Sequence, residues 1–206
     1  MWSWLAIALS CLLFIFAVEK GDKIRSVFFS ALTHCLLIIL LVTSKIATQY
    51  ELWVLIGLSA FLFSDVVGQY SRFAKLSFIG YLVAQAFYSW AMWGQVNSQF
   101  VLWLPALMLC IAIVTFFLLL PRVDSFLVPV TVMGISLVHL VCAAGEAWLV
   151  QGSISSLLGF LGGTTMALSA VLLALDKYRF HSRRARYAIS GSYYLAHALI
   201  VASTLS

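Results

Sequence analysis

The chain has 206 residues, of which 64% are hydrophobic and only 9% are charged. A soluble domain carries about 25% charged residues, so a chain with a mean hydropathy of +1.07 cannot cover a water-facing surface. The composition excludes a soluble globular protein and indicates an integral membrane protein whose solvent is lipid. The net charge is +5, but the basic residues alternate with apolar stretches, which argues against a surface that binds nucleic acid.

Eight apolar segments follow one another along the chain, each close to the roughly 20 residues that cross a bilayer as a helix. They cover residues 2–18, 27–43, 50–69, 74–93, 99–120, 126–149, 155–175 and 187–204. Only short loops remain between them. The sequence therefore predicts an all-α, polytopic bundle of about eight transmembrane helices, which forms a single transmembrane domain over residues 1–206.

The basic residues predict the orientation of these segments. Eleven of the twelve lysines and arginines lie in every second loop, and only Lys45 lies in one of the others. Because basic loops stay on the cytoplasmic side, this pattern predicts that both termini lie on the outer side. The seven tryptophans fall in the outer parts of their segments, where indole rings anchor in the headgroup region. We therefore predict a multi-pass protein of the cell membrane, either an inner or a plasma membrane.

Polar side chains inside the apolar segments are the main functional signal, because a charge at a helix centre costs about 2.5–3.5 kcal/mol on insertion scales. Asp65 lies four residues before the inner end of its segment. One interpretation is a carboxylate that reaches water or Arg72, and the other is an acid or base beside a lipid headgroup. Glu146 lies near the outer end of a different segment, two turns beyond His139, and we expect it to be a solvated interfacial carboxylate.

Other polar groups lie at a similar depth in the inner halves of four more segments. They are His34, Gln85, Ser169 and His197, with Tyr81 and Tyr88 on the helical face of Gln85 and Tyr193 one turn from His197. A single polar residue usually forms a helix–helix hydrogen bond worth about 1 kcal/mol. Several at one depth predict instead that Asp65, His34, Gln85 and His197 border one polar pocket.

Common catalytic and metal-binding motifs are absent from the sequence. It contains no G-x-S-x-G nucleophile elbow, no H-E-x-x-H zinc motif and no P-loop. The four cysteines all lie within apolar segments without a C-x-x-C pattern, which is typical of packing residues. We expect no cofactor and no bound metal.

The order and spacing of several short motifs resemble the YhhN family, the lysoplasmalogenase-like integral membrane proteins, along the whole chain. The motifs are Ser64-Asp65, Gly80-Tyr81-x-x-x-Gln85-x-x-Tyr88, Ala144-Gly145-Glu146-x-Trp148, Gly162-Gly163 through Ser169, and Tyr193-Tyr194-x-Ala196-His197. The sequence departs from the family pattern at four places. The family has glycine at position 64 and typically histidine at 85, often aspartate at 170 and commonly glutamine at 197, where this chain has serine, glutamine, alanine and histidine.

The resemblance implies a hydrolase that cleaves the vinyl ether bond of a lysophospholipid and releases a fatty aldehyde. The expected partner of the protein is therefore a membrane lipid, the lysophospholipid itself. Acid catalysis of this kind needs a proton donor, a group that stabilises the developing cation, and an ordered water. In this interpretation Asp65 is the catalytic acid or base, and His34 or His197 holds the water. The substrate-binding residues are then Gln85, Tyr88, Tyr193 and Ser169, with the tyrosines orienting the water or binding phosphate.

Two alternatives remain open at this point. The first is a non-catalytic membrane protein that binds a lipid or another small molecule, which the departures from the family pattern favour. The second is a transporter, although paired halves and interrupted helices, which are common in transporters, are not evident in the sequence.

Overall fold

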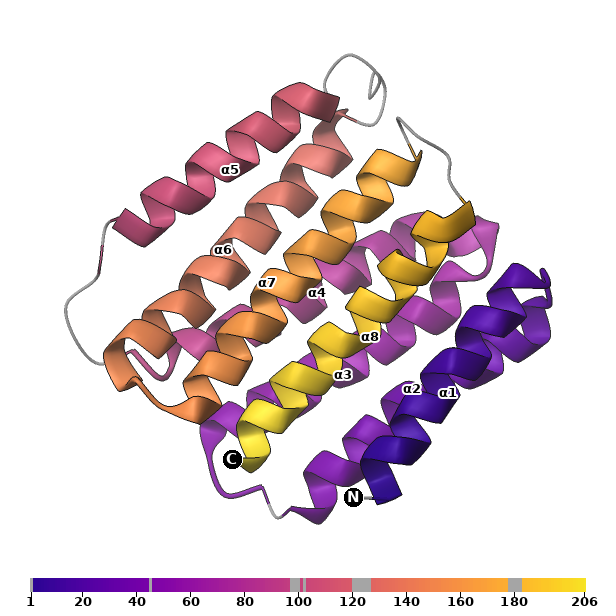
Figure 1. Cartoon of the computed structure of the whole chain (residues 1–206), viewed down its shortest axis with the longest axis horizontal. Coiled ribbons are helices and arrows are strands. Elements are labelled where there is room, and N and C mark those ends of the chain that lie inside the picture. The colour runs from indigo at the N-terminus through magenta and orange to yellow at the C-terminus, as the bar shows by residue number, and fades with distance from the viewer. Residues whose placement is uncertain (1, 45, 97–100, 102, 120–126, 178–182) are drawn as a thin grey trace. The chain divides into compact units, whose positions relative to one another are not determined.

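The computed structural model describes residues 2–44, 46–96, 101, 103–119, 127–177 and 183–206 (Figure 1). Eight α-helices and one short 3-10 helix make up its regular structure. They are α1 (Trp2–Glu19), α2 (Lys23–Thr43), α3 (Gln49–Gly68), η1 (Ser71–Phe73), α4 (Ala74–Trp93), α5 (Trp103–Leu119), α6 (Leu127–Gln151), α7 (Ile154–Leu175) and α8 (Arg183–Leu205). Every regular element of the described residues is helical, which confirms the prediction of an all-α bundle of about eight helices.

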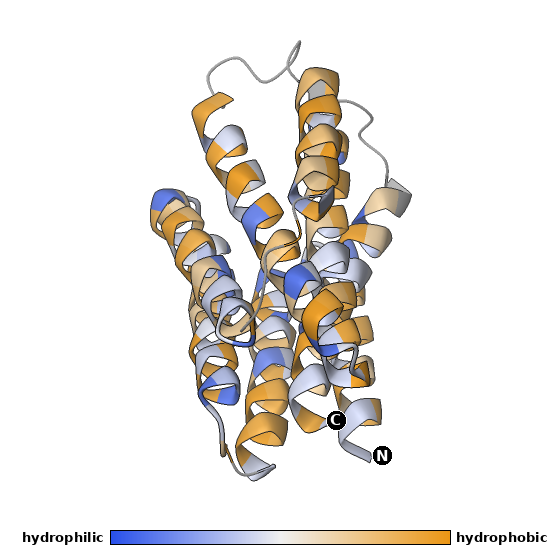
Figure 2. Ribbon diagram, turned by 90° about the vertical axis from the view of Figure 1, so that its left-hand side faces the viewer, coloured by the Kyte–Doolittle hydropathy of each residue, from blue (hydrophilic) through white to orange (hydrophobic). Residues whose placement is uncertain are grey.

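Six of the helices in the described part of the chain are both long and apolar enough to cross a membrane, namely α1, α2, α3, α6, α7 and α8. The apolar helix α5 is shorter, with 17 residues, and α4 is not among the six. Hydrophobic segments, drawn in orange, recur along the helices in Figure 2. Many of them are exposed, such as Leu9 in α1 and Val114 in α5, as expected of side chains that face lipid.

The helix ends follow the capping chemistry of the loops. Asp22 precedes α2, and its carboxylate accepts a hydrogen bond from the backbone N–H of Arg25 at 3.1 Å. Thr48 and Glu51 form a reciprocal capping box at the start of α3. Helix α2 therefore begins four residues before the predicted apolar segment, because a capped polar turn continues the helix beyond the apolar residues.

Contacts group the chain into two units, and each is described separately. The first unit comprises Met1–Ala91 with Leu205. Within it α1 packs on α2 and α2 packs on α3. A buried hydrogen bond of 2.8 Å joins the hydroxyls of Ser10 in α1 and Thr33 in α2.

The second unit comprises Met92–Thr204 with Ser206. Helix α5 packs on α6, and α6 packs on α7; α5, α6, α7 and α8 run side by side in Figure 1. A Cβ atom at Gly162 of α7 would lie 3.1 Å from the carbonyl oxygen of Ala196 and the backbone nitrogen of Ile200 in α8. The small residue thus permits a close approach of two backbones, as is common between membrane helices. The prediction of a single domain stays a prediction.

Candidate functional site

Asp65 of α3 lies at the centre of a cluster of polar side chains in the first unit. Its side chain is buried, and hydroxyl groups from two other helices point to its two oxygens. Ser30 of α2 donates to Oδ2 at 3.1 Å, and the phenol of Tyr81 in α4 donates to Oδ1 at 2.5 Å. Three helices therefore converge on one carboxyl group. The two hydroxyl donors supply hydrogen bonds to a polar group that would be costly to bury alone in an apolar interior.

His34 belongs to the same cluster. It follows Ser30 by one turn of α2, is fully buried, and its Nδ1 atom lies 3.7 Å from Oδ2 of Asp65. The same Nδ1 atom forms a 3.1 Å hydrogen bond with the backbone carbonyl oxygen of Ser30. Because a carbonyl oxygen only accepts hydrogen bonds, Nδ1 must be the donor. The structure thus brings together two of the three predicted catalytic residues, Asp65 and His34.

Small residues between α3 and α4 place Tyr81 beside Asp65. The hydroxyl of Ser77 in α4 donates to the backbone carbonyl of Ser64 in α3 at 2.8 Å. A methyl group added to Gly80 would collide with the hydroxyl of Ser64. The residues that follow Ser64 and Gly80 in the chain are Asp65 and Tyr81, so this close contact sets the separation of the carboxylate and the phenol.

Aromatic side chains of the first unit pack next to this cluster. The Phe61 ring lies 6.0 Å from the ring of Tyr81 and 5.1 Å from that of Tyr88. Tyr88 is fully buried and packs against Gly57, where a Cβ atom would lie 2.5 Å from its ring. Gln85 is also buried in α4, one turn from Tyr88. The predicted substrate-binding residues Gln85 and Tyr88 thus share a unit with Asp65.

The remaining predicted site residues lie in the second unit. The hydroxyl of Ser169 in α7 donates to the backbone carbonyl of Ile189 in α8 at 2.9 Å, so it joins two helices. The rings of Tyr193 and His197 in α8 meet edge to face, with centroids 4.6 Å apart. His197 is fully buried. The predicted pocket shared by His197 and Asp65 spans both units and stays a prediction.

Glu146 corrects an expectation drawn from the sequence. Its side chain is not solvated, because its exposed fraction is 0%. Its two carboxylate oxygens accept from the backbone N–H of Val101, at 3.2 and 3.1 Å. Val101 precedes α5, so Glu146 holds the chain near the start of that helix, where a negative charge is favourable. Position along a span predicts depth in the membrane but not which side of the helix is covered.

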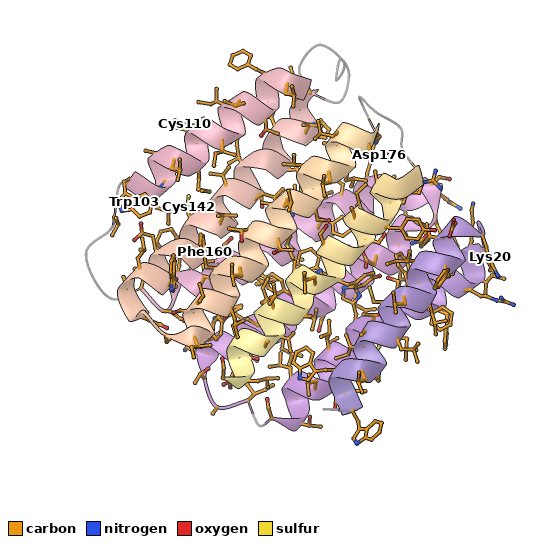
Figure 3. The ribbon with its side chains drawn as sticks, in the orientation of Figure 1. Lys20, Trp103, Cys110, Cys142, Phe160 and Asp176 are labelled. Atoms are coloured by element: carbon orange, nitrogen blue, oxygen red, sulfur yellow. The ribbon has the colours of Figure 1, made fainter. Side chains whose placement is uncertain are left out.

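The residues around Glu146 explain its burial. The preceding residue is Gly145, where a Cβ atom would collide with Leu104 of α5 and lie 3.2 Å from the Phe160 ring of α7. Trp148 stacks on Phe160 with ring centroids 5.2 Å apart. Figure 3 labels Phe160 of α7, together with Trp103 of α5 and Cys142 of α6. Three helices of the second unit thus approach closely around this stretch of α6.

Two members of the Asp65 cluster were not predicted as site residues. Ser30 gives no signal in the sequence, because serine is common in membrane helices and its partner is distant in the chain. Tyr81 precedes Gln85 by one turn of the same helix, which is a usable signal. His139, by contrast, lies in the second unit, where its Nε2 atom accepts from the indole N–H of Trp93 at 3.0 Å.

The Asp65 cluster combines groups that can transfer protons. It contains the carboxylate of Asp65, the phenol of Tyr81, which donates a hydrogen bond to that carboxylate, and the imidazole of His34, which lies close to it. Proton transfer by such positioned groups typically accelerates a reaction about 10²–10⁴-fold. Among the described residues, no three histidine, cysteine, aspartate or glutamate side chains lie close enough together to hold a metal ion.

Comparisons with known proteins agree with the membrane fold. The profile of the YhhN family matches residues 25–204. The "Uncharacterized membrane protein YhhN" of Escherichia coli O6:H1 is 26% identical over 205 residues, which cover 98% of both chains. The proteins of the same name from Escherichia coli O157:H7 and Shigella flexneri show the same identity and coverage. No solved structure matches the chain.

Proposed function

This chain belongs to the YhhN family of membrane proteins, and from that premise we propose that it is a lysoplasmalogenase-like hydrolase. Its substrate is a lysophospholipid with a vinyl ether bond, and its products are a fatty aldehyde and a glycerophospho-alcohol. The observation that carries this proposal is the buried Asp65, which accepts hydrogen bonds from Ser30 and Tyr81 and lies beside His34.

The chemistry of a vinyl ether fits such a cluster. Hydrolysis begins when a proton is added to the vinyl carbon farther from the oxygen, and the other vinyl carbon then becomes part of an oxocarbenium ion. A carboxylate held in an apolar environment stabilises this developing positive charge. The imidazole beside it supplies a second group for proton transfer to and from water.

The depth of the cluster suits a lysophospholipid of the inner leaflet. Asp65 lies three residues before the end of α3 at Gly68, which corresponds to about 5 Å along the helix. Exposed basic residues follow α3, among them Arg72 and Lys75. A phosphate held at this level would leave the vinyl ether deeper in the membrane, close to Asp65. This assignment also places the protein in the cell membrane, with its basic loops on the inner side.

A lipid-binding protein without catalytic activity is the second candidate. The observation that favours it is Ala170, which stands where the resemblance leads us to expect an aspartate. Such a protein would use the same cluster to bind a lipid headgroup but would leave the ether bond intact.

Aldehyde release by the purified protein separates the two candidates. The substrate is a 1-alkenyl lysophospholipid in detergent micelles, and the control is the 1-alkyl lysophospholipid of the same chain length and headgroup. The alkyl ether has no double bond to accept a proton, so a vinyl ether hydrolase releases aldehyde from the alkenyl lipid alone. Binding of both lipids without aldehyde release would contradict the proposed hydrolase and support the binding protein.

A further inference from the structure

The hydrogen-bond pattern around Asp65 distinguishes the roles of its neighbours. We infer that His34 is the catalytic residue that exchanges a proton with the substrate, through its Nε2 atom, and that Asp65 is a positioning residue held by Ser30 and Tyr81. This inference rests on the proposed vinyl ether hydrolysis and assigns the steps of that reaction to atoms.

The tautomer of His34 limits the exchange to one nitrogen. Its Nδ1 atom lies 3.1 Å from the carbonyl oxygen of Ser30, which can only accept a hydrogen bond. Nδ1 therefore keeps its hydrogen in both the neutral and the charged ring. Nε2 is the atom that carries a lone pair in the neutral ring and a proton in the imidazolium ion.

Asp65 is placed to act through this ring. Its Oδ2 atom lies 3.7 Å from Nδ1, beside the nitrogen that donates to the Ser30 carbonyl. Ser30 donates to the same oxygen and Tyr81 donates to Oδ1, so hydroxyl groups hold the carboxylate from two sides. A carboxylate that accepts at both oxygens is suited to orienting the His34 ring rather than to donating a proton itself.

The proposed steps balance with water as the only other reactant. The Nε2–H bond of the imidazolium ion breaks, and its proton forms a C–H bond with the π electrons of the vinyl carbon farther from the oxygen. Water attacks the resulting oxocarbenium carbon and returns a proton to the lone pair of Nε2. The hemiacetal then transfers its hydroxyl proton to the ether oxygen, and the C–O bond breaks to give the aldehyde and the free glycerol hydroxyl.

This assignment also accounts for Ala170. His34 lies in α2 and Asp65 in α3, so both titratable groups of the proposed reaction belong to the first unit. An aspartate at position 170 is then not needed for proton transfer. Because His34 has an exposed fraction of 0%, the proposed reaction requires the alkenyl chain of the substrate to enter between the helices.

Steady-state aldehyde release by the full-length protein tests these roles. In His34→Asn the side-chain amide can still donate to the Ser30 carbonyl, but Nε2 is lost. We expect kcat to fall about 10²–10⁴-fold with little change in KM. The matched control is His139→Asn, which alters a histidine of α6 that accepts a hydrogen bond from Trp93 and lies outside the predicted site. This variant should retain most of the wild-type kcat. Thermal unfolding shows whether each variant is folded.

A double-mutant cycle tests the positioning role. We expect Tyr81→Phe to lower kcat about 10-fold, because it removes a hydrogen bond to a charged group. Combined with Asp65→Asn it should lower kcat no further than Asp65→Asn alone, because Tyr81 acts only through Asp65. A purely structural role of Tyr81 would lower the melting temperature without this loss of additivity. If His34→Asn does not fold, this cycle still tests the inference, because it measures the positioning role of Asp65 and Tyr81 without that variant.

Three results would overturn the inference. An active His34→Asn variant, or a His139→Asn variant with an equal loss of kcat, would remove His34 from the proton-transfer step. Independent, multiplicative effects of Tyr81→Phe and Asp65→Asn would remove the positioning role. In each of these cases an active wild-type protein still upholds the proposed function, whereas a folded but inactive wild type would overturn both together.

Discussion

Asp65 and Glu146 are both buried carboxylates, but different kinds of groups surround them. Asp65 accepts hydrogen bonds from two side-chain hydroxyls and lies beside an imidazole. Glu146 accepts from a backbone N–H that precedes α5. Side-chain donors can rearrange or exchange protons during a reaction, whereas a backbone amide can only hold its acceptor. Burial alone therefore does not identify a functional carboxylate, and the chemistry of its partners does.

The two regions share one structural device. A small residue beside each carboxylate lets neighbouring helices approach: Gly80 meets Ser64 near Asp65, and Gly145 meets Leu104 near Glu146. Close packing is thus common to both regions. Around Asp65 it brings polar side chains together, and around Glu146 it accompanies the hydrogen bond to the chain before α5. Variants that separate activity from stability can sharpen this contrast.

The largest expected effect is a slower release of aldehyde by the Asp65→Asn variant. The substitution is nearly isosteric and removes a charge from an apolar interior, so the protein should stay folded. We expect aldehyde release to fall about 10²–10⁴-fold, because His34 then lacks the carboxylate that positions it for proton transfer. The rate per folded molecule measured alongside thermal unfolding checks this. Glu146→Gln is the matched control and should keep the wild-type rate, and equal rates for wild type and Asp65→Asn would remove Asp65 from the mechanism.

Glu146→Ala should instead lower stability. It leaves the N–H of Val101 without its carboxylate acceptor and creates a cavity among buried residues, so we expect a loss of about 3 kcal/mol in the free energy of unfolding. Denaturant unfolding in detergent measures this loss. Glu146→Gln keeps an oxygen that can accept the same hydrogen bond and should lose much less. A stable Glu146→Ala variant with a reduced rate would mean that Glu146 is a functional group after all.

The contrast also shows what the sequence could predict. Continuous apolar runs predict the helices to within a few residues, because the length of a membrane span follows from the thickness of the bilayer. Asp65 and His34 stand out as polar residues in such runs. The hydrogen bonds of Ser30 and Tyr81 to Asp65 are not predictable, because they join residues 35 and 16 positions apart on different helices. The burial of Glu146 depends in the same way on helix packing rather than on position in a span.

Gly80→Ala tests whether helix spacing sets the geometry of the cluster. The added methyl group collides with the Ser64 hydroxyl and should push α3 and α4 apart, with a loss of about 2 kcal/mol in stability and a lower rate. The companion substitution Ser64→Gly should restore part of both. Gly134→Ala is a matched control, because no atom of the described residues outside the local backbone of α6 lies within 4 Å of its added Cβ. If Gly80→Ala behaves like Gly134→Ala, the close contact does not position Tyr81.

The smallest expected effect is that of Ser169→Ala in the second unit. The sequence predicts Ser169 as a substrate-binding residue, whereas the structure shows its hydroxyl donating to the carbonyl of Ile189. Hydrogen bonds between membrane helices contribute about 0.6 kcal/mol on average, so the variant should lose about that much stability. A residue with only this role leaves KM and kcat unchanged, which aldehyde-release kinetics can check. A raised KM for the alkenyl lysophospholipid, at unchanged stability, would instead show that the Ser169 hydroxyl contacts the substrate, and would extend the functional region beyond the first unit.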